Sequence, residues 1–249
     1  MQLPAALAGL LGSGLGLVVG SFVALLTWRL PRGRAPTGRS VCDACGARLG
    51  AADLVPVFSF LWQRGRCRHC GAAIASRNLV IEIAAGVIGA ALLWRFPQPE
   101  GLVVALAGWW LLALIVLDVE EYWLPDVLVL PFCGVALLVP GPLLPERLWG
   151  AGLGLGGLWL IGALYRWRTG RDGLGGGDPK LLGALGLLHG VWSLPFLITG
   201  ASLLGLALAG WDRVRGRTIV ATTRLPFGAL LAAMALLLLW VGPQWKELL

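Results

Sequence analysis

The chain has 249 residues, of which 57 % are hydrophobic and only 13 % are charged, and its formal net charge is +7. Soluble domains carry about one quarter charged residues, so this composition excludes a soluble globular protein. The apolar residues form windows of about 17–20 residues, the length of a helix that crosses roughly 30 Å of hydrocarbon. We therefore expect an all-α polytopic membrane protein embedded in a lipid bilayer. Its positive charge is a topology signal, and we expect no nucleic-acid partner.

The first apolar window covers residues 4–28, and its charges follow it: Arg29, Arg32 and Arg34. A secretory signal peptide has its positive charges in front of the apolar stretch, so this order favours a first transmembrane helix over residues 1–28. The positive-inside rule then places the N-terminus outside and the following segment in the cytosol. That segment, residues 29–78, contains nine arginines against Asp43 and Asp53, and we expect it to form a small cytosolic domain.

Further apolar windows predict the remaining transmembrane helices. The run 181–210 is ambiguous, because it is long enough for one long span or two short ones, but His189 to Ser193 followed by Pro195 predicts a turn within it. With two spans there, the arginine-rich stretches 29–77, 166–171 and 213–224 share the cytosolic side, and only Arg95, Arg147 and Lys246 lie on the other. We therefore predict about eight spans, with both termini outside. The other windows are 79–94, 101–117, 124–139, 148–165 and 225–241.

Four cysteines in the segment 29–78 form two Cys-x-x-Cys pairs, each followed by glycine: Cys42 with Cys45, and Cys67 with Cys70. This spacing is typical of a structural zinc site, in which four thiolates close a tetrahedral shell and leave no position open for catalysis. Disulfides, an iron–sulfur cluster or cysteines without a ligand role are the alternatives, and a cytosolic location argues against disulfides. We predict one structural Zn²⁺ per chain.

Carboxylates at the ends of apolar spans are candidates for function, because burying a charge in hydrocarbon is costly. Asp118 ends one span, and Asp178 begins another after the glycine-rich residues Gly175 to Gly177. In the eight-span topology both lie at the cytosolic edge. Two carboxylates brought together share one proton, so one can activate water while the other donates to a carbonyl, as in aspartic proteases. The glycines would let an extended substrate strand approach Asp178 closely.

Other interpretations of these acids remain open. Asp178 could cap the helix that follows it, since it precedes a proline. The glycine run could be a phosphate-binding loop, although the Gly-x-x-x-x-Gly-Lys-Ser/Thr pattern is missing. At the level of the whole chain, the alternatives are a transporter with an acidic proton relay and a membrane scaffold stapled by zinc.

Taken together and in order, the motifs resemble those of the prepilin peptidases, also called type IV leader peptidases, which are intramembrane aspartic proteases of the Gly-x-Gly-Asp type. The resemblance extends over nearly the whole chain. In chain order it rests on Gly20 to Phe22 with Trp28 to Pro31, the two cysteine pairs around Leu54 to Leu61, Ser76-Arg77 with Glu82, Asp118 with Leu124 to Asp126, Gly175 to Asp178 with Lys180, and Leu225 to Gly228.

The resemblance implies that Asp118 and Asp178 are the catalytic pair. It implies cleavage of the short basic leader of type IV prepilins or pseudopilins, after a glycine, at the cytosolic side of the bacterial inner membrane. It also implies N-methylation of the new terminus with S-adenosylmethionine, an activity associated with the cytosolic loop. The family commonly has Asn where this chain has Ala24, and Tyr-Pro where it has Asn78-Leu79. The expected division is a first transmembrane helix (1–28), a cytosolic four-cysteine zinc domain (29–78) and a transmembrane aspartic peptidase domain (79–249).

Overall fold

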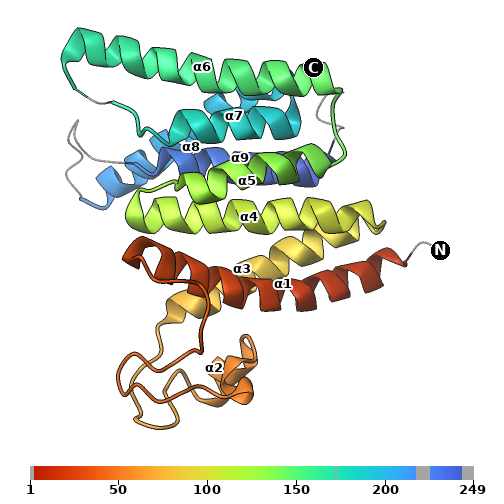
Figure 1. Cartoon of the computed structure of the whole chain (residues 1–249), viewed down its shortest axis with the longest axis vertical. Coiled ribbons are helices and arrows are strands. Elements are labelled where there is room, and N and C mark those ends of the chain that lie inside the picture. The colour runs from red at the N-terminus through yellow and green to blue at the C-terminus, as the bar shows by residue number, and fades with distance from the viewer. Residues whose placement is uncertain (1–2, 172, 217–224, 243–249) are drawn as a thin grey trace. The chain divides into compact units, whose positions relative to one another are not determined.

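The structure is a computed structural model that describes residues 3–171, 173–216 and 225–242 (Figure 1). Within these residues the secondary structure is helical, apart from two isolated β-bridges, which confirms the all-α class. The chain divides within α4 into two compact units, Met1–Trp109 and Trp110–Leu249. The α-helices are α1 (Ala5–Arg29), α2 (Phe58–Trp62), α3 (Ser76–Arg95), α4 (Glu100–Glu121), α5 (Asp126–Leu138), α6 (Leu144–Thr169), α7 (Asp178–His189), α8 (Leu194–Val214) and α9 (Phe227–Val241).

In the first unit, α1 and α3 pack closely because glycines line the face of α1 that meets α3. A Cβ atom at Gly12 or Gly16 would collide with the backbone of Gly89 or Ala85 in α3. Small residues at this spacing let membrane helices approach to backbone contact, where close packing replaces the hydrophobic effect as the source of association. The glycine content of the sequence thus reflects helix packing in this unit.

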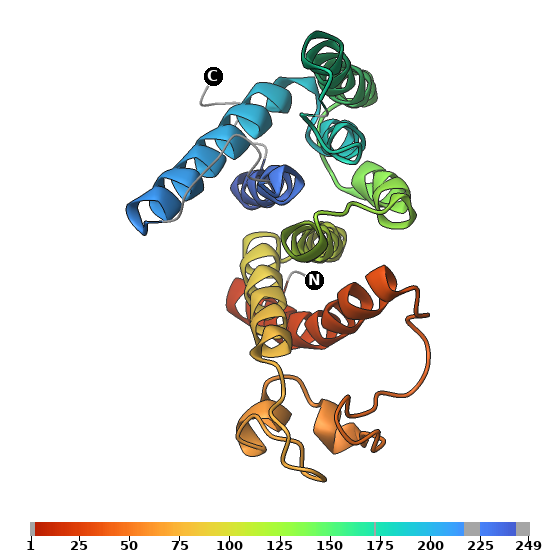
Figure 2. The ribbon, with the colours of Figure 1, turned by 90° about the vertical axis from the view of Figure 1, so that its left-hand side faces the viewer.

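Between α1 and α3 the chain forms a small domain, residues 30–75, which we call the four-cysteine domain. It contains the 3₁₀ helices Leu30–Arg32 and Ala51–Leu54, and the short helix α2. Figures 1 and 2 agree in placing this domain alongside the Ser76 end of the α1–α3 pair, rather than beyond that end. Two polar residues of α3 attach that helix to α1 and to the four-cysteine domain.

The first of these residues is Arg77, which links α3 to α1. Its guanidinium donates to the Ala24 carbonyl at 2.9 Å and to Thr27 Oγ1 at 2.6 Å. The second is Glu82, which is 8 % exposed and accepts a hydrogen bond at 2.8 Å from the backbone N–H of Val57 in the four-cysteine domain. The cost of burying the Glu82 carboxylate is thereby reduced, and the domain is attached to α3.

In the second unit, α7 is the central helix. It contacts α5, α6 and α9, and Figure 2, which looks along the helices, shows it among them. Its side chains from Leu181 to His189 are buried, as expected for a helix that is apolar on every face. Glycines again allow the close approach: Gly150 and Gly154 of α6 face the backbone of Gly186 and Leu182 in α7.

The long apolar run 181–210 is divided, and the predicted turn is present. Helix α7 ends at His189, and Gly190 adopts φ +82°, a conformation that side-chain-bearing residues rarely take. A 3₁₀ turn, Val191–Ser193, follows, and Pro195 lies in the first turn of α8. The residues that predicted the turn, among them Gly190 and Pro195, are therefore the residues that form it in the structure.

A buried arginine closes the same, C-terminal end of α7. Arg147 in the first turn of α6 is 6 % exposed and donates to backbone carbonyls at the C-terminal ends of two other helices. It reaches Leu187 O at 2.8 Å in α7, and Ala136 O at 2.5 Å and Val139 O at 3.0 Å at the end of α5. Carbonyls in the last turn of a helix lack the N–H donor that a continuing helix would supply, and one planar guanidinium donates to the ends of both helices.

Within the part of the chain that the structure describes, five helical segments are long and apolar enough to cross a membrane: Ala5–Arg32, Ser76–Arg95, Glu100–Glu121, Leu144–Thr169 and Val191–Val214. Helices α5 and α9 are apolar but shorter. The predicted windows 124–139 and 225–241 correspond to these two helices. Helix α7, which forms the first part of the predicted run 181–210, has only 12 residues. Three residues of the topology argument, Arg217, Arg224 and Lys246, lie outside the described residues.

Candidate active site and metal centre

Asp118 lies in the last turn of α4, directly after the largely buried apolar run Leu111 to Leu117, and is only 5 % exposed. Its Oδ2 atom accepts a hydrogen bond at 2.7 Å from the backbone N–H of Ala229. Ala229 is in the first turn of α9, where backbone N–H groups have no partner within the helix. A carboxylate at this position also interacts favourably with the positive end of the helix dipole.

Asp178 is the first residue of α7 and is 7 % exposed. The cap of the helix is Gly177, and no side chain caps it, so the alternative in which Asp178 serves as the helix cap is wrong. The Asp178 N–H donates to Gly175 O at 3.2 Å, which folds the glycine segment back over the carboxylate. A Cβ atom at Gly175 would lie 3.1 Å from Asp178 Oδ2.

The two carboxylates converge on a single glycine, Gly228 in the first turn of α9. A Cβ atom built at Gly228 would lie 3.0 Å from Asp178 Oδ1 and 3.1 Å from Asp118 Oδ2. Because both oxygens lie so close to one point, they are at most about 6 Å apart, near enough for each charge to affect the other. The structure therefore brings together two buried acids that are sixty residues apart in the sequence.

Gly177 has a packing role. A Cβ atom there would come within 2.7 Å of the Cβ of Leu124, a buried residue just before Pro125. Gly176 differs, because a Cβ atom at Gly176 would meet nothing within 4 Å. It lines a groove of about 470 Å³ between α6 and the segment 174–180. The walls of the groove come from Leu158, Trp159, Gly162, Ala163, Arg166, Trp167, Leu174, Gly175, Gly176, Pro179 and Lys180.

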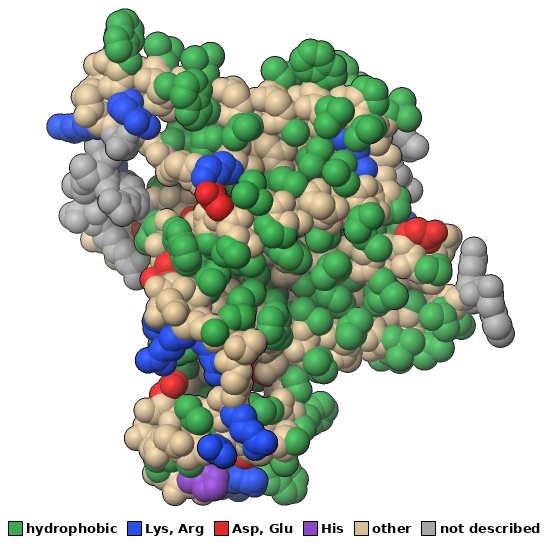
Figure 3. Space-filling model, in the orientation of Figure 1, with side chains coloured by type: hydrophobic (Ala, Val, Ile, Leu, Met, Phe, Trp, Pro, Cys, Tyr) green, Lys and Arg blue, Asp and Glu red, His purple; other side chains and the backbone are tan. Residues whose placement is uncertain are grey.

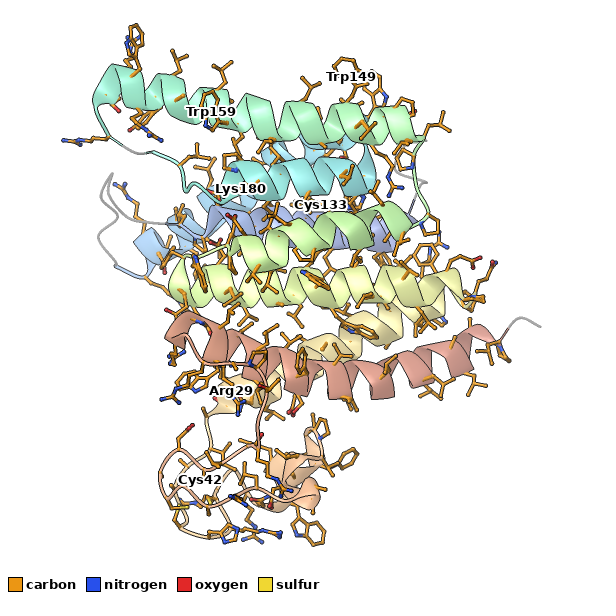
Figure 4. The ribbon with its side chains drawn as sticks, in the orientation of Figure 1. Arg29, Cys42, Cys133, Trp149, Trp159 and Lys180 are labelled. Atoms are coloured by element: carbon orange, nitrogen blue, oxygen red, sulfur yellow. The ribbon has the colours of Figure 1, made fainter. Side chains whose placement is uncertain are left out.

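An ion pair joins the starts of α5 and α7 beside this groove. Lys180 Nζ lies 2.7 Å from Asp126 Oδ1 and 2.8 Å from Oδ2, with both side chains about half exposed. Figure 4 labels Lys180 on α7. The sequence analysis placed both residues in motifs without pairing them. Exposed pairs of this kind contribute roughly 0–1 kcal/mol, so the contact mainly fixes geometry.

In the first unit, the predicted metal ligands Cys42, Cys45, Cys67 and Cys70 form one cluster, with all four Sγ atoms within 4.8 Å of one another. The Sγ atoms of Cys42 and Cys70 are 3.9 Å apart, which excludes a disulfide between them. Four sulfurs around a Zn²⁺ with Zn–S distances of about 2.3 Å would be separated by roughly 3.8 Å. The cluster therefore fits a tetrahedral zinc ion, although other thiol-binding metals have similar demands.

The two cysteine pairs have the same backbone design. In each, the first cysteine donates its N–H to a carbonyl five residues ahead, and the glycine after the second cysteine donates back to the first: Cys42 with Ala47 and Gly46, and Cys67 with Ala72 and Gly71. Gly46 and Gly71 have φ of +68° and +72°. The predicted need for glycine after each pair is thus explained by a left-handed turn.

The pKa values of two of the thiols are shifted by the backbone N–H groups of these turns and by the neighbouring thiols. The N–H groups of Cys45 and Ala44 donate to the Cys42 sulfur and lower its pKa to about 7. At Cys70 the Ala72 N–H acts to lower the pKa, but the neighbouring Cys45 thiol raises it, to about 11 overall. Four thiolates so close together would repel one another. A bound divalent cation would offset this repulsion and allow all four thiols to lose their protons.

Comparison with known proteins adds a second kind of evidence. A family model described as "Bacterial Peptidase A24 N-terminal domain" matches residues 15–96, and one described as "Type IV leader peptidase family" matches residues 105–210. A Pseudomonas putida protein named prepilin leader peptidase/N-methyltransferase is 33 % identical over 268 residues, covering 95 % of this chain and 90 % of the relative. The chain belongs to the type IV leader peptidase family.

Two further relatives of this chain have the same printed name. The Dichelobacter nodosus protein is 34 % identical, with 84 % of this chain and 73 % of the relative covered. The Dickeya chrysanthemi protein is 37 % identical, with 80 % and 81 % covered. The comparison with solved structures found no match. Family membership makes the chain a membrane peptidase and sets aside the transporter and scaffold interpretations.

The sequence analysis missed the role of Leu225 to Gly228 in this leader peptidase. It quoted the motif without a function, whereas the structure places Gly228 against both acids and the next N–H on Asp118. A glycine in the first turn of an apolar helix, directly after Pro226 and Phe227, was the available signal. A glycine at such a position indicates that other groups approach the helix backbone so closely that no side chain would fit between them.

Proposed function

We propose that the chain is an aspartic endopeptidase that removes the leader peptide of type IV prepilins or pseudopilins, with Asp118 and Asp178 as its catalytic residues. The observation that carries this proposal is the convergence of the two buried carboxylates on Gly228. Family membership supplies the reaction, and the names of the relatives supply the substrate class.

The proposed chemistry follows from the spacing of the acids. A separation of at most about 6 Å places both carboxylates within reach of one water molecule or one peptide carbonyl oxygen. One carboxylate, ionised, takes a proton from water as the water oxygen attacks the scissile carbonyl carbon. The other, protonated, donates to the carbonyl oxygen. When the tetrahedral intermediate collapses, its C–N bond breaks, the first carboxyl gives its proton to the leaving nitrogen, and the second carboxylate takes a hydroxyl proton back, which releases the new amine. Burial of both acids limits competing contact with bulk water.

The segment 173–177 is the proposed binding site for the substrate strand. Gly175 covers Asp178, and Gly176 faces the groove beside α6 with no atom blocking its Cα. An extended substrate strand can run along this exposed backbone, hydrogen-bond to it, and present its scissile bond to the carboxylates. Gly177 contributes by packing on Leu124, which holds the segment in place.

The proposed topology has eight spans, with the acids at the cytosolic side of the bacterial inner membrane. The groove supports this arrangement, because Arg166 at the basic end of α6 and Gly175 beside Asp178 line the same cavity. In the first unit the basic residues Arg29 and Arg77 likewise share one end of the α1–α3 pair. Under the positive-inside rule both ends face the cytosol. Helices α5, α7 and α9 then cross as short spans.

We further propose that the chain methylates the amine released by cleavage, with S-adenosylmethionine as methyl donor and with a requirement for residues 29–78. The printed names of the relatives support this second activity. Among the described residues no arrangement identifies where the methyl donor binds, so no residue is assigned to it. The zinc ion, held by Cys42, Cys45, Cys67 and Cys70, would stabilise this segment without taking part in either reaction.

The test is incubation of the purified protein in detergent with a prepilin, followed by mass spectrometry of the product. Asp118→Asn and Asp178→Asn should each lower cleavage by at least about 10³-fold, since each carboxylate has its own proton-transfer role. Both should also abolish methylation, because no free amine is made. Asp126→Asn is the matched control, a nearby exposed carboxylate whose loss should change cleavage less than about tenfold.

Substantial cleavage by either catalytic variant would contradict the aspartic mechanism. Methylation is read separately, from the one added methyl group on the mature N-terminus. Cys67→Ser, which damages the metal cluster, should leave cleaved and unmethylated product. A methylated product from that variant, or a wild-type protein that cleaves and never methylates, would contradict the proposed role of residues 29–78.

A further inference from the structure

The four-cysteine domain exposes an apolar surface that neither proposed reaction uses. Its helix α2 has Phe58 68 % exposed, Leu61 61 % exposed and Trp62 90 % exposed. These residues are spaced i, i+3 and i+4, so they lie on one face of the helix. Val55, just before the helix, is also exposed. An aqueous domain gains nothing from presenting such a cluster to water, which indicates an interaction surface.

The depth of α2 relative to α3 identifies what this surface meets. Val57, directly before α2, donates its N–H to Glu82, and Glu82 is the seventh residue of α3. At 1.5 Å per residue, its Cα lies about 9 Å along the helix axis from Ser76. The Glu82 side chain leans back towards that end, as helical side chains do. The start of α2 is therefore held at the level of the first turns of α3, not beyond them.

Helix α3 is itself a candidate membrane span. A short helix held about 5–10 Å inside the end of a span lies at the boundary between lipid head groups and acyl chains, the depth of interfacial helices. The figures agree, because the domain lies alongside the α1–α3 pair. The exposed face of α2 is thus at the depth of lipid. Phe22 of α1, seven residues before the Arg29 end of that helix, is likewise exposed.

The charges around α2 complement a lipid surface. Arg64 and Arg66 are exposed and follow the helix directly, within a domain region where arginine greatly exceeds acid. In Figure 3 the hydrophobic side chains and arginines of this domain lie beside one another. Basic residues near anionic lipid contribute about 1 kcal/mol each, and aromatic side chains such as Trp62 favour the interfacial region.

The connection between the domain and α3 is also held firmly. Val57 has φ +62°, and the Phe58 N–H donates back to Pro56 O at 2.6 Å, which forms a γ-turn. A β-branched residue rarely adopts this conformation, and it persists only where surrounding contacts enforce it. The Glu82 carboxylate on the Val57 N–H is such a contact. It orients the start of α2 as well as setting its depth.

We propose that α2 is an interfacial anchor: Phe58, Leu61 and Trp62 insert into the lipid leaflet at the Ser76 end of α3, and Arg64 and Arg66 bind anionic head groups. The four-cysteine domain is then fixed to the membrane surface by two elements, the Glu82 contact and the lipid-inserted face. This inference does not depend on which residues are catalytic, and its test does not read cleavage.

The test uses the full chain in lipid nanodiscs with a fluorescent amino acid replacing Trp62, and phosphatidylcholine brominated in the upper part of its acyl chains as quencher. The matched control has the same label at Asp43, an exposed residue of the first cysteine pair. We expect the label at position 62 to lose at least about half of its emission in brominated lipid, as for an inserted interfacial residue, and the label at 43 to lose much less. Absence of quenching at position 62 would overturn the proposal.

Two variants of the labelled protein test the apolar and the basic contributions. Phe58→Ser with Leu61→Ser should reduce the quenching while zinc content stays at one per chain, which shows that the domain remains folded. Persistent quenching would mean that this face does not insert. Quenching should rise when anionic phosphatidylglycerol is added, and Arg64→Gln with Arg66→Gln should remove that rise. If the label ignores lipid and responds only to added prepilin, the surface binds substrate and the proposal is wrong.

Discussion

Replacing Gly228 by alanine adds a single methyl group between the two proposed catalytic acids. That methyl would lie 3.0 Å from Asp178 Oδ1, 3.1 Å from Asp118 Oδ2 and 2.5 Å from Leu124 Cδ1. The end of the leucine side chain can rotate away. The carboxylate oxygens have less freedom, since Asp118 is held by the Ala229 N–H and Asp178 by the start of α7. Each oxygen must therefore retreat by a few tenths of an ångström.

This crowding sets the expected magnitude of the effect. Adding a methyl group to a packed site costs about 1–3 kcal/mol. If the cost falls on the reacting geometry, it corresponds to a roughly 5- to 150-fold fall in rate, at 1.4 kcal/mol per factor of ten. Alanine is also a better helix former than glycine by about 1 kcal/mol, so the stability of α9 should not fall correspondingly. We expect Gly228→Ala to lower kcat with little change in KM or in thermal stability.

The assay is prepilin cleavage at several substrate concentrations, with a thermal unfolding curve for each variant. Gly134→Ala in α5 is the matched control, because a Cβ atom there meets nothing within 4 Å. It should keep wild-type activity. Full activity in Gly228→Ala would refute the reasoning that places the reaction between these carboxylates. An equal loss in Gly134→Ala would assign the effect to helix stiffening instead of to the acids.

The remaining predictions concern the metal and the buried arginine. Elemental analysis should find about one zinc per chain, lost in Cys67→Ser and retained in Cys133→Ser, because closed four-thiolate sites need every ligand; iron instead of zinc, or no metal, would contradict this. Arg147→Met should lower the free energy of unfolding by about 3–5 kcal/mol, because buried helix-end carbonyls lose their guanidinium donor. The control, Arg168→Met at the exposed end of the same helix, should change the free energy of unfolding by less than about 0.5 kcal/mol. Equal effects of the two arginine substitutions would refute the helix-end role.

What the sequence predicted depended on local signals. The turn between α7 and α8 was predictable because Gly190 and Pro195 are themselves its cause. The cysteine cluster was predictable because two short motifs with glycine at fixed positions fold alike. Asp118 and Asp178 were both expected at span ends, and topology alone placed them at one depth. In each case the residue types imposed the local geometry.

The features that the sequence did not predict are contacts between residues far apart in the chain. The eight-span topology placed Arg147 on the outer side, and nothing near it in the sequence indicates the carbonyls of α5 and α7. The hydrogen bond between Val57 and Glu82 joins two motifs that were noted separately. The place of Gly228 between two acids needed three helices to be positioned at once. Such contacts follow from packing, which periodicity and spacing do not encode.

The shortness of the helices around the acids has a consequence for the lipid itself. Helices α5, α7 and α9 have 13, 12 and 15 residues, lengths of roughly 18–23 Å at 1.5 Å per residue. As the short spans of the proposed topology, they would have to match a hydrocarbon layer about 30 Å thick. Hydrophobic mismatch of this size is relieved by local thinning of the bilayer, which draws head groups and water inwards around the protein. The proposed aspartic mechanism requires water at Asp118 and Asp178, and short spans would supply it by bringing the membrane surface to these carboxylates.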